Sequence, residues 1–132
     1  MIAQSYVNKI INVLSGSVKF AFIFGSATTK YFNSKSDIDI AVWLENVPVT
    51  VEEVIDLKYQ VEKSINFEYD IDLIILNNSD IIIANQVITT GQIIIDNEPE
   101  FTNRYILSRR SMYFDFKFFR KPLEDNLKTK IL

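Results

Sequence analysis

Hydrophobic residues follow two periods along residues 2–96, and each period predicts a different kind of element. Apolar residues recur every four positions from residue 2 to residue 14, which predicts an amphipathic helix. An apolar run over 18–24 predicts a buried strand that leads directly into Gly25. A polar loop follows, and alternating residues over 37–44 predict a second strand.

The second half of this pattern contains two more helices and two more strands. Thr50 opens a helix that extends to about Asn66, with Glu53 placed for a capping box. Residues 69–76 alternate as a third strand, and 80–89 form a short helix closed by Gly91. Residues 92–96 are expected to be an edge strand. Helices that alternate with about four strands predict an α/β or α+β domain built on a small mixed sheet.

Residues from about 100 to 132 differ from the rest of the chain in composition. They are predicted to be helical, with a break at Pro122, and they are rich in aromatic and basic side chains. Residues 1–103 hold six Lys/Arg against fourteen Asp/Glu, a net charge of −8, whereas 104–132 hold eight against three, a net charge of +5. We therefore expect residues 1–132 to form a single acidic domain with a basic aromatic tail.

Composition excludes several classes of chemistry. The chain has no cysteine and no histidine, so it has no disulfide, no Ser-His-Asp triad and no zinc site that uses either ligand. Any metal ion must be held by oxygen atoms, which favours Mg²⁺, Mn²⁺ or Ca²⁺. The N-terminus lacks the features of a signal peptide, and no apolar run approaches the roughly 20 residues of a membrane span. We expect a cytoplasmic protein without membrane contact.

The strongest chemical motif is Gly25-Ser26, then ten residues, then Asp37-Ile38-Asp39. A Gly-Ser turn exposes backbone N–H groups to phosphate oxygens, and the Ser26 hydroxyl adds a further donor. Two carboxylates one residue apart project from the same side of a strand, where they suit Mg²⁺ held against a nucleotide. A solvated strand face is the alternative for two aspartates, but their position behind the Gly-Ser turn favours a site.

The third strand offers another carboxylate for the same end of the sheet. Asp70 and Asp72 share a strand face by the same alternation, and either one lies beside the first pair if the strands are neighbours. Carboxylates gathered in one cleft repel each other unless cations neutralise them, so such a cluster indicates a divalent-metal site. A hydrated strand face is the alternative for both residues.

This arrangement resembles the minimal nucleotidyltransferases of the DNA polymerase beta superfamily. The resemblance rests on the strand before Gly25-Ser26, on Asp37-Ile38-Asp39 and on the strand that contains Asp70-Ile71-Asp72, and it spans roughly residues 15–96. It implies a polymerase-beta-like fold, with Gly25 and Ser26 contacting the nucleotide. It also implies that Asp37, Asp39 and Asp72 are catalytic metal ligands for two Mg²⁺ ions, with Asp70 the second choice for the last position.

Chains of this size resemble the MntA-type antitoxins of HEPN/MNT toxin–antitoxin pairs. The resemblance implies an antitoxin that transfers AMP from ATP to a tyrosine of a partner HEPN ribonuclease toxin, within a hetero-oligomer. One departure concerns the residues after Gly-Ser, where many relatives carry Arg-Gly and this chain has Thr28-Thr29-Lys30. Lys30 would replace the arginine as a point charge at the nucleotide, without its bidentate geometry; a solvated loop lysine is the alternative.

Two rival functions follow from the same residues. One is a non-catalytic antitoxin that neutralises its partner by steric contact through the aromatic tail. The other is a transferase acting on a small molecule, for which 132 residues leave little room to build an acceptor pocket. Packing on the sheet combined with partner contact is the favoured interpretation of the tail, because Met112, Phe116, Phe119 and Leu123 fall at helical spacing. The acidic body argues against direct nucleic-acid binding.

Overall fold

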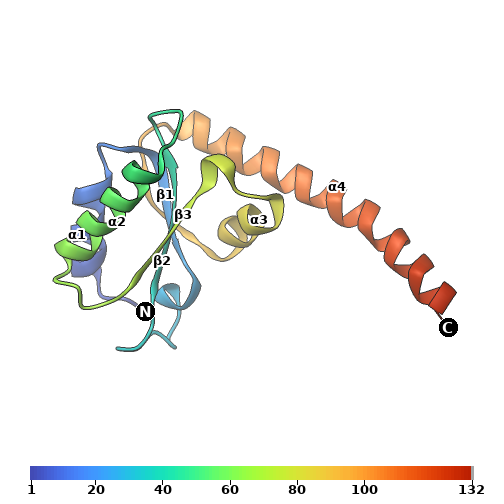
Figure 1. Ribbon diagram of the computed structural model, residues 1–132, viewed down its shortest axis with the longest axis horizontal. Helices are drawn as coiled ribbons and strands as arrows, with labels where there is room; N and C mark the ends of the chain where they lie inside the picture. Colours follow the sequence, from blue (N-terminus) through green and yellow to red (C-terminus); the bar gives the residue numbers. More distant parts are fainter. Residues whose placement is uncertain (132) are drawn as a thin grey trace.

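A four-stranded mixed sheet lies at the centre of the fold (Figure 1). The computed structural model describes the backbone of residues 1–131 and the side chains of 1–119, 121, 122 and 125. The strand order is β3-β2-β1-β4, where β1 spans Val18–Phe24, β2 Ile38–Leu44, β3 Ile71–Ile75 and β4 Gln92–Asp96. β1 pairs antiparallel with both β2 and β4, and β2 pairs parallel with β3. The predicted mixed sheet, α+β class and edge position of 92–96 are confirmed.

One face of the sheet packs against helices α1 (Gln4–Leu14) and α2 (Val51–Ser64). Ile38, Ile40 and Val42 of β2 are fully buried on this face, as their alternation predicts. α2 begins where expected, because the Thr50 side chain accepts a hydrogen bond from the Glu53 amide at 3.2 Å. Burial of a large aliphatic side chain contributes about 1.5–3 kcal/mol, so this layer supplies much of the stability.

The opposite face packs against α3 (Ile81–Thr90) and the start of α4 (Pro99–Ile131). Phe20, Phe22 and Phe24 of β1 contact this layer, together with Ala41 of β2 and Tyr105 of α4. Asp39 and Asp72 belong to this face by alternation with Ala41 and Ile74, which lie in the same cluster. The two acidic residues therefore lie at the edge of the α3/α4 layer.

Gly91 directly follows α3, as predicted. The reason that this position needs a glycine is not the left-handed conformation of a helix cap. Its φ is −87°, outside the left-handed region that a glycine cap usually occupies. A Cβ at this position would overlap the Val87 carbonyl oxygen and crowd the Ile23 carbonyl oxygen at 3.2 Å. Gly91 is thus required for space between α3 and β1.

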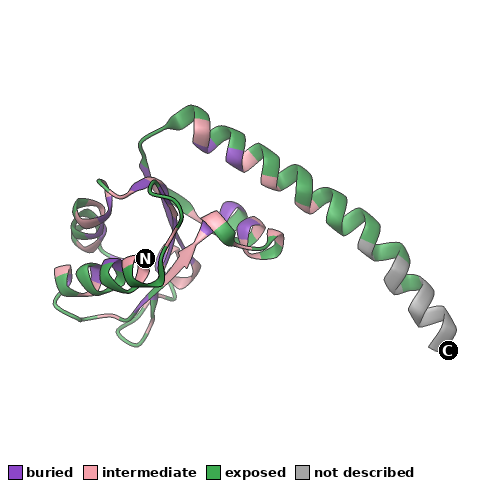
Figure 2. Ribbon diagram, turned by 45° about the horizontal axis from the view of Figure 1, so that its top comes forward, coloured by how far each residue is buried: buried purple, intermediate pink, exposed green. Residues whose placement is uncertain are grey.

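The predicted break at Pro122 is wrong, because α4 continues through this residue to Ile131. Beyond the first turns the helix leaves the body and is largely exposed (Figure 2). A proline inside a helix costs about 3 kcal/mol, and α4 accommodates Pro122 at an exposed position. The tail residues Arg120 and Leu123 lie outside the described side chains, and Leu132 lies outside the described backbone.

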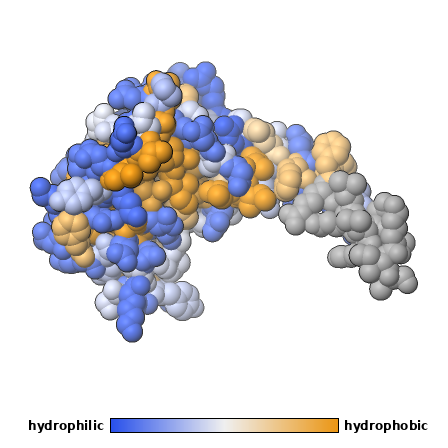
Figure 3. All heavy atoms as spheres, in the orientation of Figure 1, coloured by the Kyte–Doolittle hydropathy of each residue, from blue (hydrophilic) through white to orange (hydrophobic). Residues whose placement is uncertain are grey.

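Apolar side chains form a band across the visible face of the molecule, from the sheet towards the projecting part of α4 (Figure 3). Within the described residues, no helix combines the length and the apolar character needed to cross a membrane. The outer part of α4 exposes several large apolar side chains to solvent.

Candidate active site

The end of β1 forms the tight turn that the sequence predicts. Residues Gly25–Thr28 make a single turn of 3₁₀ helix directly after Phe24. Gly25 has a φ of +69°, which lies in the left-handed region that glycine occupies at least cost. A Cβ on Gly25 would overlap Oδ2 of Asp39, so the absence of a side chain lets the turn and this carboxylate approach each other.

Two threonine side chains fix the shape of this turn. Thr28 Oγ1 donates to the Gly25 carbonyl at 2.9 Å, and Thr29 Oγ1 donates to the Ser26 carbonyl at 2.9 Å. Both donors belong to the Thr28-Thr29-Lys30 segment, for which the resemblance implies Arg-Gly. Sequence reasoning missed this role, although threonine three residues after a turn carbonyl is a known local motif. In this chain the segment stabilises the turn.

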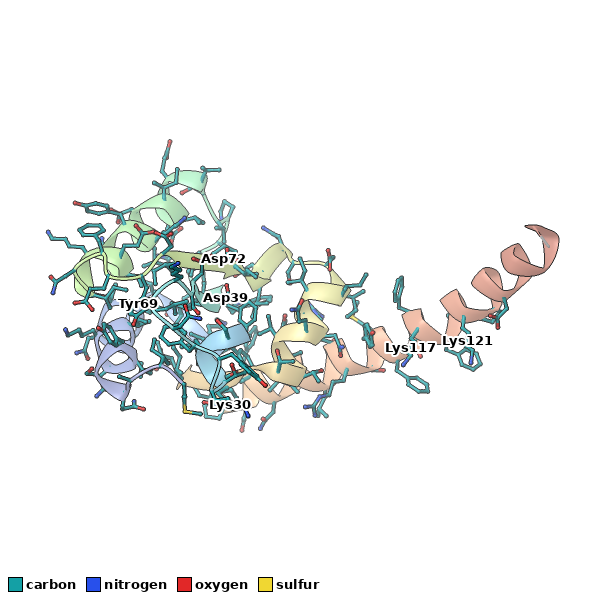
Figure 4. All side chains as sticks on the ribbon, turned by 90° about the horizontal axis from the view of Figure 1, so that it is seen from below. Lys30, Asp39, Tyr69, Asp72, Lys117 and Lys121 are labelled. Carbon is teal, nitrogen blue, oxygen red and sulfur yellow. The ribbon has the colours of Figure 1, made fainter. Side chains whose placement is uncertain are left out.

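Strand pairing brings Asp39 and Asp72 together. Asp39 is the register partner of Phe24 in β1 and of Asp72 in β3, so the turn and both carboxylates meet at one end of the sheet. Figure 4 shows Asp39 and Asp72 next to each other on adjacent strands. The strand register thus places the turn and these two carboxylates at the same end of the sheet, where the sequence predicts that they converge.

Burial raises the pKa of the Asp39 carboxyl above its ordinary value. The negative charge of Asp72 raises it further, followed by that of Asp37 and by a hydrogen bond with Asp72. Asp37 lies just before β2 and is exposed, whereas Asp39 is half-buried. The three carboxyl groups are therefore close enough to interact electrostatically, and Asp39 lies at the centre of the group.

Asp70 stands apart from this group. It precedes β3 and is exposed, and its backbone carbonyl accepts a hydrogen bond from the Ile38 amide at 2.9 Å. It is not among the groups that perturb the pKa of Asp39, whereas Asp72 is. Between the two acids of this strand, Asp72 is the one that the register pairs with Asp39.

Lys30 and Ser26 differ in how they relate to the site. The Lys30 ammonium is exposed and lies over the ring of its neighbour Tyr31, 5.4 Å from the centroid. Figure 4 shows it displaced from Asp39 and Asp72. Ser26 lies within the turn, half-buried, and its carbonyl also accepts from the Thr29 amide at 3.0 Å.

The donor set at this edge fits a hard divalent cation. Aspartate oxygens are the ligands that Mg²⁺ prefers, and neither of the ion pairs found among the described residues involves Asp37, Asp39 or Asp72. Repulsion between adjacent carboxylates, seen in the raised pKa of Asp39, is what a bound cation would relieve. Among the described residues, however, no three acidic side chains lie close enough together to hold a metal ion in this structure.

Three solved structures have the same fold as this chain. One, described as a toxin–antitoxin with AMP-PNP, gives a TM-score of 0.77 at 23% identity and covers 92% of this chain and 98% of that chain. The toxin–antitoxin MntA–HepT gives 0.74 at 22% identity, with coverage of 96% and 99%. A complex of tri-AMPylated Shewanella oneidensis HEPN toxin with MNT antitoxin gives 0.74 at 23% identity, with coverage of 95% and 98%.

No curated protein matches the sequence. The family model described as Polymerase beta, Nucleotidyltransferase matches residues 8–100, which contain the turn and all the acidic residues discussed above. This match extends from α1 through the start of α4 and covers the whole sheet. The chain belongs to the polymerase beta nucleotidyltransferase family.

Proposed function

We propose that this protein is an antitoxin that transfers AMP from ATP to a tyrosine hydroxyl of a partner HEPN ribonuclease toxin. The family supports nucleotidyl transfer. Two similar structures support the nucleotide and the acceptor: one contains AMP-PNP, and another contains an AMPylated HEPN toxin beside its MNT antitoxin. The expected compartment is the cytoplasm, which supplies ATP.

One observation carries the proposal: Asp39 and Asp72 are register partners at the point where the Gly25 turn ends β1. Mg²⁺ would be held by the carboxylates of Asp37, Asp39 and Asp72. The resemblance to the family implies two such ions. Bound there, Mg²⁺ would neutralise the triphosphate and stabilise negative charge that develops during displacement.

The residues of this chain would divide the remaining work among them. Backbone amides of Gly25 and Ser26, with the Ser26 hydroxyl, would bind phosphate oxygens, and Lys30 would contribute a mobile positive charge. The acceptor oxygen attacks the α-phosphorus, and the bond from this phosphorus to pyrophosphate breaks. Asp72 would take the proton of the attacking hydroxyl, because its carboxylate is the more exposed of the central pair.

Intact mass spectrometry of the partner tests this proposal. The product of the neighbouring gene, as the candidate partner, is incubated with the chain, ATP and Mg²⁺, and its mass is expected to rise by whole AMP units. Asp39→Asn and Asp72→Asn should each abolish the increase, whereas Asp70→Asn, the matched change two residues before Asp72, should retain most of it. An unmodified partner with the wild-type protein would contradict the proposed transfer.

Steric neutralisation is the second candidate function, and the exposed rings on α4 favour it. Phe114, Phe118 and Phe119 are 67–71% exposed. Aromatic side chains dominate the energetics of protein interfaces. Asp39→Asn separates the two functions: a catalytic antitoxin loses neutralisation but keeps the complex, whereas a steric antitoxin keeps both.

A further inference from the structure

The outer part of α4 carries an apolar stripe that is exposed in the described part of the chain. Leu107, Phe114 and Phe118 are 66%, 68% and 67% exposed, and their spacing of seven and four places them on one side of the helix. Phe114 and Phe118 also line a hollow of about 490 Å³. Side chains this large and this exposed indicate a docking surface.

A row of basic residues borders this stripe. Arg110, Lys117 and Lys121 are exposed and share a second side of α4 next to the first, with spacings of seven and four. Figure 4 shows Lys117 and Lys121 on the part of the helix that extends beyond the body. α4 therefore presents an apolar stripe with positive charge along one border.

α2 presents the complementary pattern. Val51, Ile55 and Tyr59 recur every four residues, and they are 74%, 63% and 54% exposed. Glu52 and Asp56 are exposed beside them at the same spacing. Lys63 follows Tyr59 at the same spacing of four, so it continues the line of Val51, Ile55 and Tyr59 with a charged residue. The first two turns of α2 thus form an apolar stripe bordered by negative charge.

The two stripes cannot meet within one chain. α2 packs with α1 on one face of the sheet, whereas α4 packs with α3 on the other and then leads away from the body (Figures 1 and 2). Both stripes are therefore open to contact with a second molecule.

We propose that the outer part of α4 docks on α2 of a second copy of this chain. The apolar stripe of α4 in one copy then contacts the apolar stripe of α2 in the other. Lys117 and Lys121 of the first copy face Glu52 and Asp56 of the second. A two-fold axis makes the contact twice, because each copy contributes one α4 and one α2. The opposite net charges of the body and the tail favour this occupant. The inference does not depend on the proposed transfer of AMP.

Sedimentation equilibrium of the full chain alone tests the occupant. The wild-type protein should form a dimer of the 15.3 kDa chain and should dissociate as salt increases. Lys117→Glu/Lys121→Glu and Glu52→Lys/Asp56→Lys should each weaken self-association about tenfold or more, because each places like charges opposite each other. Lys9→Glu/Lys35→Glu, which changes net charge as the α4 reversal does but at exposed sites elsewhere, should leave the dimer intact.

Mixing the two reversed variants gives the decisive result. One variant has acidic residues on both surfaces and the other has basic residues on both, so neither matches itself but each matches the other. An equal mixture should recover a heterodimer, which misfolded variants would not do. A monomeric wild-type protein, a dimer indifferent to both reversals or a mixture that stays monomeric would overturn the proposal. A monomer whose α4 reversal abolishes binding to the HEPN partner would assign this surface to that partner instead.

Discussion

At the scale of single residues, the site depends most on a position without a side chain. Gly25 combines a φ of +69° with contact to Oδ2 of Asp39, so Gly25→Ala meets two penalties. The left-handed conformation costs a non-glycine residue about 1–2 kcal/mol, and the new methyl group displaces the carboxylate. We expect the free energy of unfolding to fall by about 1–3 kcal/mol and AMP transfer to be lost, measured by urea unfolding and by the mass assay.

Gly16→Ala is the matched control for this change. A Cβ at Gly16 meets no atom within 4 Å, and its backbone lies outside the left-handed region. Its stability should change by less than about 0.5 kcal/mol and its activity should persist. Equal stability and activity in the two variants would show that the close approach of Gly25 to Asp39 has no consequence.

Asp39 has an expected cost in stability that follows from its raised pKa. The folded state holds the proton of this carboxyl more tightly than the unfolded state, so stability decreases as pH rises from the unfolded pKa to the raised one, and the loss persists above it. Asp39→Asn removes this penalty. Because burial of the charged carboxylate and the negative charges of Asp72 and Asp37 all oppose its ionisation, we expect the variant to melt at a higher temperature at pH 7 without metal.

Addition of Mg²⁺ should reverse the order of the two proteins. A cation that binds only the folded state raises the melting temperature of the wild type, whereas Asp39→Asn should respond weakly because it lacks a central ligand. Thermal unfolding with and without Mg²⁺ measures both effects and needs no turnover. An identical Mg²⁺ response in the two proteins would remove Asp39 from the proposed metal site.

The sequence predicts much of the site at this scale because strand alternation is simple geometry. Asp37 and Asp39 follow from the Gly-Ser spacing, and the convergence of Asp72 with them needs only the correct neighbouring of strands. The turn-locking bonds of Thr28 and Thr29 could not be predicted in the same way. They require the carbonyl positions of a 3₁₀ turn, which composition does not specify.

At the scale of elements, predictions succeed where local pattern and tertiary packing agree. The bounds of β1 and β4 match the predicted ranges because turn residues limit both runs. α4 is the exception, since Pro122 predicts a break and the helix continues. The cost of a proline inside a helix is therefore not enough to end α4 at this position.

Asn77 joins two elements in a way that the sequence does not reveal. Its Oδ1 accepts from the Leu44 amide at 2.8 Å and its Nδ2 donates to the Leu44 carbonyl at 3.0 Å. The side chain thereby extends the pairing of β2 where β3 has ended. Asn77 lies between the predicted third strand and the predicted short helix, and its bridge to Leu44 is recognisable only when the positions of both elements are known.

Asn77→Ala should therefore destabilise the fold. It leaves both backbone groups of Leu44 without their partner at a fully buried residue, a loss of about 1–3 kcal/mol in the free energy of unfolding. Asn78→Ala is the control, because this neighbour is exposed. Urea unfolding of the two variants measures the difference. Equal midpoints would mean that solvent replaces the bridge at little cost.

At the scale of the whole molecule, the chain divides into a packed body and a projecting helix. Among the described residues of α4, Thr102 and Tyr105 are buried in its first turns, and the Tyr105 ring packs against Phe20 and Trp43 of the sheet. Beyond them the described side chains are exposed or half-buried. The expectation that the tail packs on the sheet is therefore confirmed for the start of α4. The residues predicted to do so, Met112, Phe116 and Phe119, lie instead on the exposed part of the helix. Contact of the tail with a partner stays a prediction.

A chain that ends at Tyr113 separates folding from association. It keeps Thr102, Tyr105 and Arg109, whose guanidinium lies 4.8 Å from the Tyr105 ring centroid, so the body retains its α4 contacts. Its free energy of unfolding, measured by urea at a concentration where the wild type is monomeric, should change by less than about 0.5 kcal/mol. Sedimentation should show a monomer, because Phe114, Lys117, Phe118 and Lys121 are gone. A truncated protein that unfolds far more easily would place the outer helix in the folded core, whereas one that still dimerises would locate the interface elsewhere.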